Sequence, residues 1–141
     1  MNKEEKRISR CISLQTIYAY EISGEEDILI YKEFMRHFRN DFSEYYGELS
    51  SSQLNFSEKL YISSIKNKNY IDSIIKERLK NWDISRLAII DKLILRMSAA
   101  EMLFIDEVPP KVSIVEGVEI AKVFSTKDSS NFVNGILDAI Y

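Results

Sequence analysis

The sequence is short of the residues that metal and redox sites need. Among 141 residues there is one cysteine, Cys11, and one histidine, His37. A single cysteine cannot form an intrachain disulfide, and one Cys with one His cannot supply the ligand cluster of a zinc site. Cys11 falls on an apolar helical stripe and is expected in the core. We therefore expect no metal centre, no cofactor and a reducing compartment.

Proline, glycine and long hydrophobic runs are also scarce. The two prolines are adjacent at Pro109 and Pro110, and with four glycines they provide too few turns for a sandwich or barrel of short strands. No apolar run reaches the length of a membrane span, and the charged amino end lacks the apolar core of a signal peptide. These absences favour an all-α, soluble and cytoplasmic protein that does not contact membranes.

The overall charge is mildly acidic, and positive charge is confined to two segments. A net charge of −3 excludes nucleic-acid binding through a globally basic surface. The excess of cations is +2 over residues 1–10 and +5 over residues 59–96. Helical spacing places Lys3, Lys6, Arg7 and Arg10 on one face near the amino end. That face is either a local nucleic-acid contact or an ordinary solvated surface.

Apolar residues recur at helical spacing along most of the chain. The helices expected from this pattern cover residues 3–22, 25–40, 55–80 with a break near 67–69, 87–104, 111–124 and 128–140. A loop with a short helix is expected over residues 41–52, and a polar interruption over residues 81–85. Capping residues are expected at Ser23, Asn55 and Asp128. Gly117 and Gly135 lie inside helical patterns, which suggests that a neighbouring backbone or a ligand approaches closely there.

The common signatures of catalysis are missing from the sequence. No nucleophile is placed beside a base, and no pair of carboxylates shows the pattern of an acid–base site. Neither of the glycine-rich phosphate-binding motifs occurs. We therefore expect a binding protein rather than an enzyme.

Three strings of residues together carry a family resemblance. The first is Arg10-x-x-Ser13-x-Gln15-x-Ile17-Tyr18, and the second is Ile94-Leu95-Arg96 with Glu101. The third reads Val108-Pro109-Pro110-Lys111-Val112, then Glu116-Gly117-Val118-Glu119-Ile120-Ala121-Lys122, then Phe132-Val133-Asn134-Gly135-Ile136-Leu137-Asp138. In order and spacing they resemble the NusB family of transcription antitermination factors. The resemblance covers nearly the whole chain and is most specific over residues 7–21 and from about Trp82 onward.

The sequence departs from the family pattern at a few positions. Ser13 stands where the family usually has Ala, and Ile17 stands where it has Leu. The family's Asn-Glu-Ala is replaced by Val115-Glu116-Gly117. These changes affect local packing and hydrogen bonding.

The resemblance implies a fold and a function. It implies about seven helices in two small bundles packed into one compact unit, a single domain over residues 1–141. The helical segments place the amino-terminal sub-bundle at about 1–80 and the carboxyl-terminal one at about 81–141. The family is non-enzymatic and binds the single-stranded boxA element of nascent RNA together with NusE, a small-subunit ribosomal protein. The complex joins RNA polymerase and suppresses premature termination, notably in ribosomal RNA operons.

The resemblance also points to contact residues. Phosphate contacts are expected from the basic face formed by Lys3, Lys6, Arg7 and Arg10. Tyr18 and Phe132 offer aromatic planes for unstacked bases, with core packing as the alternative. The start of the last helix offers polar groups that either meet RNA or cap the helix: Lys127, Asp128, Ser129, Ser130, Asn131 and Asn134. NusE contacts are expected at Tyr18, Glu21 and Glu101.

Three other readings remain open at this stage. The chain is alternatively an RNA-binding module related to the amino-terminal domain of ribosomal RNA cytosine methyltransferases, although 141 residues leave no room for the catalytic domain. A purely structural interaction protein would keep the helices and bind no RNA. A homodimer would mask the RNA and partner surfaces until RNA binds.

Overall fold

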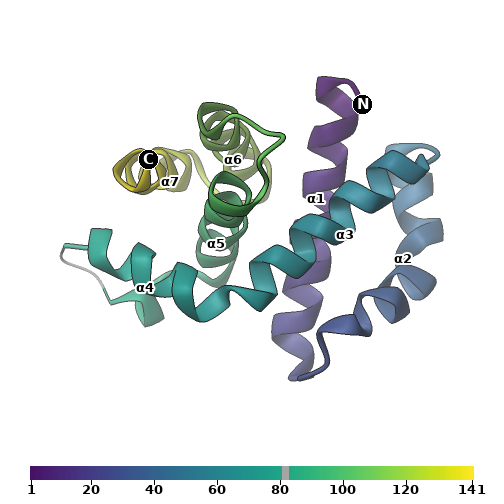
Figure 1. Ribbon diagram of the computed structural model, residues 1–141, viewed down its shortest axis with the longest axis horizontal. Coiled ribbons are helices and arrows are strands. Elements are labelled where there is room, and N and C mark those ends of the chain that lie inside the picture. The colour runs from purple at the N-terminus through teal and green to yellow at the C-terminus, as the bar shows by residue number, and fades with distance from the viewer. Residues whose placement is uncertain (81–82) are drawn as a thin grey trace. The chain divides into compact units, whose positions relative to one another are not determined.

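The computed structural model describes residues 1–80 and 83–141, and this part of the chain is helical with no strand (Figure 1). The all-α expectation is confirmed. The α-helices are α1 (Lys3–Ser23), α2 (Tyr31–Tyr46), α3 (Ser51–Lys66), α4 (Lys68–Arg78), α5 (Ile89–Phe104), α6 (Pro110–Phe124) and α7 (Lys127–Ile140). Two short 3-10 turns are η1 (Ile28–Ile30) and η2 (Ile84–Arg86).

The chain divides into two compact units, Met1–Lys66 and Asn67–Tyr141. The sequence places the division near residue 80 instead, but α4 packs against α5 and α7 and so belongs to the second unit. The expected break near 67–69 is confirmed, because α3 ends at Lys66 and α4 begins at Lys68. The first residues of the interruption expected over 81–85, and the start of the stronger family resemblance at Trp82, lie outside the described residues.

The first unit is built on the contact between α1 and α3. Ser9, Ser13 and Ser57 are fully buried there, and such short side chains let two helices approach closely. The Ser13 hydroxyl lies within hydrogen-bond distance of the Ser57 carbonyl, at 2.8 Å, and of the Ser9 carbonyl, at 3.0 Å. Ser13, which departs from the family pattern, therefore gains hydrogen-bond partners on both helices. Leu60 and Tyr61 of α3 complete this core.

The first helix matches its expected range, and local capping explains both of its ends. Asn2 and Glu5 form a reciprocal capping box at its start. Gly24 follows its last turn with φ +71°, the left-handed conformation that glycine adopts without strain. Near its carboxyl end, Tyr18 and Ile22 are exposed.

The expectations for residues 25–55 were wrong in their boundaries. Ser23 does not begin the next helix; Asp27 caps η1 by accepting from the Leu29 N–H at 2.9 Å, and α2 starts only at Tyr31. This helix continues through the expected loop to Tyr46, whose hydroxyl accepts a 2.9 Å hydrogen bond from Gln15 of α1. Burial raises the pKa of Tyr46 to about 12, so this phenol stays neutral.

The next helix, α3, also starts earlier than expected. Ser50 and Gln53 bond reciprocally, with the Gln53 N–H donating to Ser50 Oγ at 3.1 Å and the Ser50 N–H donating to Gln53 Oε1 at 2.9 Å. This capping box replaces the one expected at Asn55 and Glu58.

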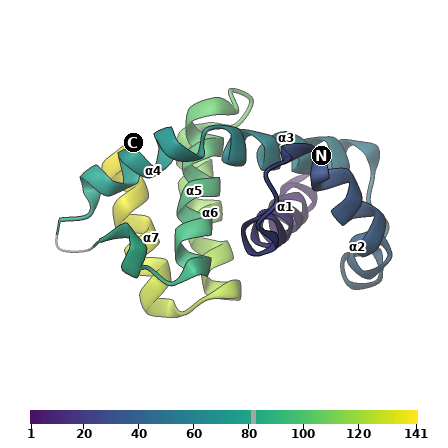
Figure 2. The same cartoon turned by 90° about the horizontal axis from the view of Figure 1, so that it is seen from below.

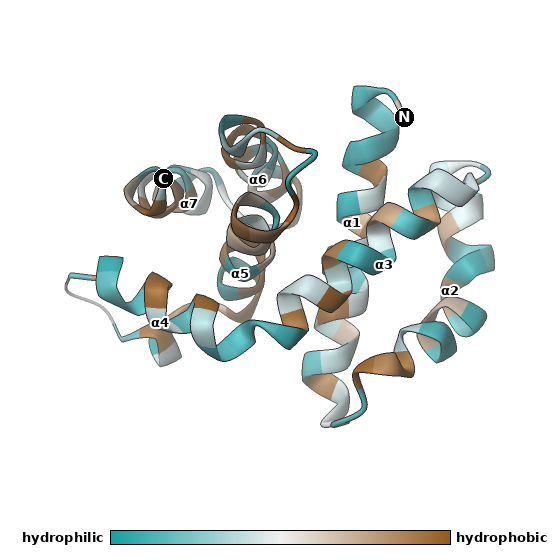
Figure 3. Cartoon of the chain, in the orientation of Figure 1, coloured by the Kyte–Doolittle hydropathy of each residue, from teal (hydrophilic) through white to brown (hydrophobic). Residues whose placement is uncertain are grey.

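The second unit surrounds α5 with α4, α6 and α7 (Figure 2). Every residue from Leu93 to Glu101 is buried, so α5 is the central helix of this unit, and its ribbon is mostly hydrophobic (Figure 3). Arg96 is buried and forms a bidentate pair with Asp72 of α4, at 3.0 Å and 2.8 Å. An ion pair thus fastens α4 to the centre of the unit.

The starts of α6 and α7 lie one or two residues away from the positions expected from the sequence. Pro110 is the first residue of α6, where its missing N–H costs nothing. Thr126, not Asp128, caps α7 by accepting from the Ser129 N–H at 3.0 Å. Val115 and Val123 of α6 are exposed.

The two helical glycines differ in their surroundings. A Cβ added at Gly117 would lie 2.5 Å from Ser98 Oγ and 3.1 Å from Leu137 Cδ1, so α6 depends on glycine to pack against α5 and α7. A Cβ at Gly135 would meet no atom within 4 Å. The expected close approach is confirmed for Gly117, whereas at Gly135 none of the residues that the structure describes makes one.

Replacing each glycine by alanine is expected to change stability in opposite directions. Gly117→Ala lowers the free energy of unfolding by about 1 to 2 kcal/mol, because the core must shift to admit the methyl group. Gly135→Ala raises it by about 0.5 to 1 kcal/mol, because alanine favours the helix and meets no obstacle. Urea denaturation of both variants checks this prediction, and equal effects at the two positions would contradict it.

Candidate nucleic-acid interface

The amino-terminal turns of α1 carry exposed positive charge. Lys3 is exposed, and Lys6 and Arg7 are partly exposed. The capping box fixes the helix start, so these cations project from a defined backbone. Figure 3 shows this end of α1 as hydrophilic. Flexible cations on an ordered helix are suited to contacts with phosphates.

Arg10 does not belong to this exposed face. Its side chain is only 2% exposed, and its guanidinium lies 5.5 Å from the centroid of the Phe56 ring of α3. Helical spacing alone placed it with Lys3, Lys6 and Arg7, but the contact with α3 covers it. A cation stacked on an aromatic face in a buried position stabilises the packing of α1 on α3.

Arg10→Ala is therefore expected to act on stability. The free energy of unfolding falls by about 1 to 2 kcal/mol, from the lost cation–π contact and the lost packing of the aliphatic stem. Thermal unfolding measures this effect, with Lys3→Ala as the control that leaves stability unchanged. An Arg10 variant as stable as wild type would contradict this role.

Tyr18 and Glu21 lie one turn apart near the carboxyl end of α1. Tyr18 is 38% exposed and Glu21 is partly exposed, so both side chains reach the surface. The core alternative for Tyr18 does not hold. An accessible phenol ring offers a stacking plane and a hydroxyl at the same point.

At the start of α7, two of the expected polar residues are engaged within the fold. Ser130 is buried, and its hydroxyl donates to the Lys127 carbonyl at 2.7 Å. The Ser129 hydroxyl donates to Asp91 at 2.9 Å, and the Ser129 N–H donates to Thr126 Oγ1 at 3.0 Å. Lys127 and Asp128 are exposed. Capping thus accounts for Ser129, and burial removes Ser130 from the expected contact surface.

Asp91 of α5 fixes the turn between α6 and α7. Its carboxylate accepts from Ser125 at 2.7 Å and from Ser129 at 2.9 Å. Neither serine–aspartate bond was expected from the sequence, because the partners are more than thirty positions apart. This pair of bonds holds the amino end of α7 in place.

Phe132 is partly exposed and lines a pocket of about 300 Å³. Leu87 and Ala88 contribute apolar walls, and Arg86 and Asp128 contribute charge. Arg86 was not among the expected contact residues, although it lies in the basic segment 59–96. Asn131 and Asn134 are exposed on the same helix as Phe132.

Glu101 is buried and does not present a partner surface. Its side chain is 2% exposed, and its carboxylate accepts a 2.6 Å hydrogen bond from Ser113 of α6. The interpretation of Glu101 as a NusE contact is therefore corrected to a bond between α5 and α6. The sequence showed its position in a motif but not the helix that covers it.

The described residues hold no group of three or more His, Cys, Asp or Glu side chains placed to bind a metal. Cys11 is buried, as the sequence suggested, and His37 is exposed. Within the described ranges, no helix has both the length and the apolarity of a membrane span.

Comparison with known proteins gives the family context. The model of the NusB family matches residues 7–141. A transcription antitermination protein NusB from Chloroherpeton thalassium is 41% identical over 136 residues, which are 96% of this chain and 61% of that protein. Another, from Syntrophus aciditrophicus, is 34% identical over 137 residues, 97% of this chain and 80% of that protein. The chain thus spans about three-fifths of the first relative.

Solved structures show the same fold. T. maritima NusB superposes with a TM-score of 0.79 at 29% identity, covering 96% of this chain and 89% of that one. A chain in the crystal structure of a plectonemic RNA supercoil superposes with a TM-score of 0.80 at 26% sequence identity. The superposition covers 97% of this chain and 94% of that one. A chain in the crystal structure of antitermination factors NusB and NusE in complex with dsRNA superposes with a TM-score of 0.80 at 24% sequence identity. The superposition covers 99% of this chain and 98% of that one. The last likeness concerns the fold alone.

Proposed function

The chain belongs to the NusB family, and we propose on that basis that it is an RNA-binding transcription antitermination factor. It binds boxA RNA in nascent transcripts together with NusE, in the cytoplasm. The complex joins RNA polymerase and suppresses premature termination, notably in ribosomal RNA operons. Its activity is binding rather than catalysis, in keeping with relatives described as antitermination proteins.

The observation that supports this proposal most strongly is the family match over residues 7–141. The match includes α1 from Arg7 onward and the whole of α7, where the polar and aromatic candidates lie. Two relatives that are 41% and 34% identical to this chain are described as transcription antitermination proteins NusB, which supports a role in antitermination.

The proposed contacts follow the accessible side chains. Lys3, Lys6 and Arg7 neutralise phosphates of the RNA. Tyr18 and Phe132 stack on unpaired bases, as aromatic side chains do in single-strand recognition. Lys3, Lys6, Arg7 and Tyr18 belong to the first unit, and Phe132 belongs to the second.

Polar side chains add hydrogen bonds to these contacts. Lys127, Asp128, Asn131 and Asn134 meet the RNA from the exposed side of α7. Tyr18 and Glu21 also form the NusE contact on α1. The buried residues Arg10, Ser130 and Glu101 hold the helices that present the contact residues, and Ser129 holds the α7 start.

A transcription assay tests the proposed function. Purified RNA polymerase, NusE and this protein are combined on templates that carry boxA or a scrambled boxA upstream of a terminator. We expect read-through to rise only when boxA, NusE and this protein are all present. Equal read-through on the scrambled template would overturn the proposal.

A further inference from the structure

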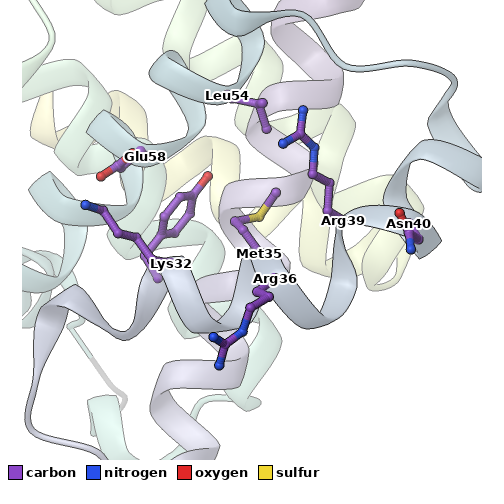
Figure 4. A pocket seen from close by; sticks show the side chains of 8 residues that line it. Lys32, Met35, Arg36, Arg39, Asn40, Leu54 and Glu58 are labelled. Carbon is purple, nitrogen blue, oxygen red and sulfur yellow. The ribbon is translucent and has the colours of Figure 1, made fainter.

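A second candidate surface lies in the first unit and is formed by residues other than those used above. The facing sides of α2 and α3 enclose a pocket of about 500 Å³ (Figure 4). Its floor is apolar, formed by Tyr31, Met35 and Leu54. The Tyr31 hydroxyl donates to Ser57 at 3.1 Å, and burial raises the pKa of Tyr31, so the floor is uncharged at neutral pH. A pocket of this volume accommodates a small planar ligand.

The rim of this pocket is basic. Lys32, Arg36 and Arg39 line it from α2. Arg36 pairs with Glu33, and in Figure 4 its side chain extends away from Met35. Lys32 and Arg39 are exposed and form no hydrogen bond or ion pair with any residue that the structure describes. They are seven residues apart, about 10 Å along the helix, so two separate cations are available for anionic groups.

Two further side chains provide the rim with hydrogen-bond donors and acceptors. The carboxylate of Glu58 accepts hydrogen bonds, and the amide of Asn40 both donates and accepts. Carboxylates accept from the amino groups of bases, and amides pair with base edges. An acidic peptide would satisfy Lys32 and Arg39 but would meet repulsion from Glu58. The apolar floor suits a base, the two cations suit phosphates, and Glu58 and Asn40 can hydrogen-bond to the edge of a base. Together these features favour a nucleotide as the ligand.

The first turn of α3 connects this pocket with the basic end of α1. Gln53 donates from Nε2 to the Glu5 carbonyl of α1 at 3.3 Å, and the next residue, Leu54, lines the pocket. The pocket and the first turns of α1, which carry Glu5 and the partly exposed Lys6, therefore flank the same turn of α3. A single RNA strand that contacts α1 can continue to the pocket.

We propose that the pocket between α2 and α3 binds a nucleotide of single-stranded RNA outside boxA. The base lies against Met35 and Leu54, and its phosphates contact Lys32 and Arg39. This inference rests on the proposed RNA-binding function, and it extends the contact from α1 onto α2.

Binding of RNAs of different length to the full chain tests the inference. In the presence of NusE, the probes are a minimal boxA RNA and the same RNA extended at its 5′ or 3′ end by unstructured uridines. Of the two RNAs extended at the 5′ or the 3′ end, one is expected to bind the wild-type protein about tenfold more tightly than the minimal boxA RNA does. Lys32→Gln/Arg39→Gln abolishes this gain and leaves minimal boxA binding unchanged. The matched control Lys66→Gln/Lys76→Gln, with the same change in charge, keeps the gain. A gain that survives in Lys32→Gln/Arg39→Gln overturns the inference.

Methyl NMR gives a readout that does not depend on boxA recognition. With methionine methyl labelling, oligouridine alone is expected to shift the Met35 signal, whereas Met97, buried in the second unit, stays unchanged. A Met35 signal that responds to a glutamate-rich peptide but not to oligouridine overturns the inference in favour of an acidic partner. If minimal boxA fails to bind while oligouridine still shifts Met35, the boxA function fails and the pocket inference stands.

Discussion

Asp72→Ala is expected to lower the free energy of unfolding by about 3 kcal/mol. The Asp72 carboxylate accepts two bonds from Arg96, at 3.0 Å and 2.8 Å, and Arg96 is only 2% exposed. Without the carboxylate, a buried guanidinium loses its bidentate partner, which costs far more than loss of a surface pair. Urea denaturation of the full chain, followed by far-ultraviolet circular dichroism, measures the change.

Two controls separate this ion pair from general effects of charge. Asp72→Asn keeps an acceptor for one bond and is expected to cost less than Asp72→Ala. Glu33→Ala breaks the exposed pair with Arg36 and is expected to change stability by less than about 0.5 kcal/mol. If Glu33→Ala and Asp72→Ala were equally destabilising, the proposed anchoring of α4 on α5 would be wrong.

Lys3→Gln/Lys6→Gln/Arg7→Gln is expected to weaken boxA RNA binding about 10- to 100-fold at low salt. Each of the three cations that neutralises a phosphate of the single strand releases a counterion from the RNA. The slope of log affinity against log salt should therefore become shallower by about 2. Fluorescence anisotropy at several salt concentrations, with NusE present, measures both quantities.

The matched control for this variant is Lys66→Gln/Lys76→Gln/Lys80→Gln, which removes three exposed cations elsewhere on the chain. We expect it to retain both the affinity and most of the salt slope. Equal losses in the two triple variants would mean that the amino-terminal cations act only through net charge. Arg10 is left intact in both, because its loss would weaken the packing of α1.

Hydrophobic periodicity predicted most helices of this protein because each carries a long apolar stripe. It failed at residues 41–46, where the last turns of α2 are held by tertiary contacts such as Gln15 with Tyr46. The start of α3 could have been read from Ser50 and Gln53, whose spacing is that of a capping box. The glycine at 117 was interpretable from sequence, since a helical glycine signals a close neighbour.

The site was predictable only as far as local spacing determines exposure. Spacing groups Arg10 with Lys3, Lys6 and Arg7, but only the fold shows that Phe56 covers it. Likewise Glu101 belongs to a family motif, but only the fold shows that it is buried and that its carboxylate accepts a hydrogen bond from Ser113 of α6. The pocket between α2 and α3 gave no motif at all, because its residues come from two helices. Such features depend on which helices meet, and the periodicity of one helix does not contain that information.

The central claim is that this protein recognises boxA RNA together with NusE. The most direct test measures the affinity of the wild-type chain for boxA RNA and for a scrambled RNA of equal composition, each with and without NusE. The account predicts tighter binding to boxA, strengthened further by NusE. Equal binding to both RNAs, or no binding even with NusE, would contradict it.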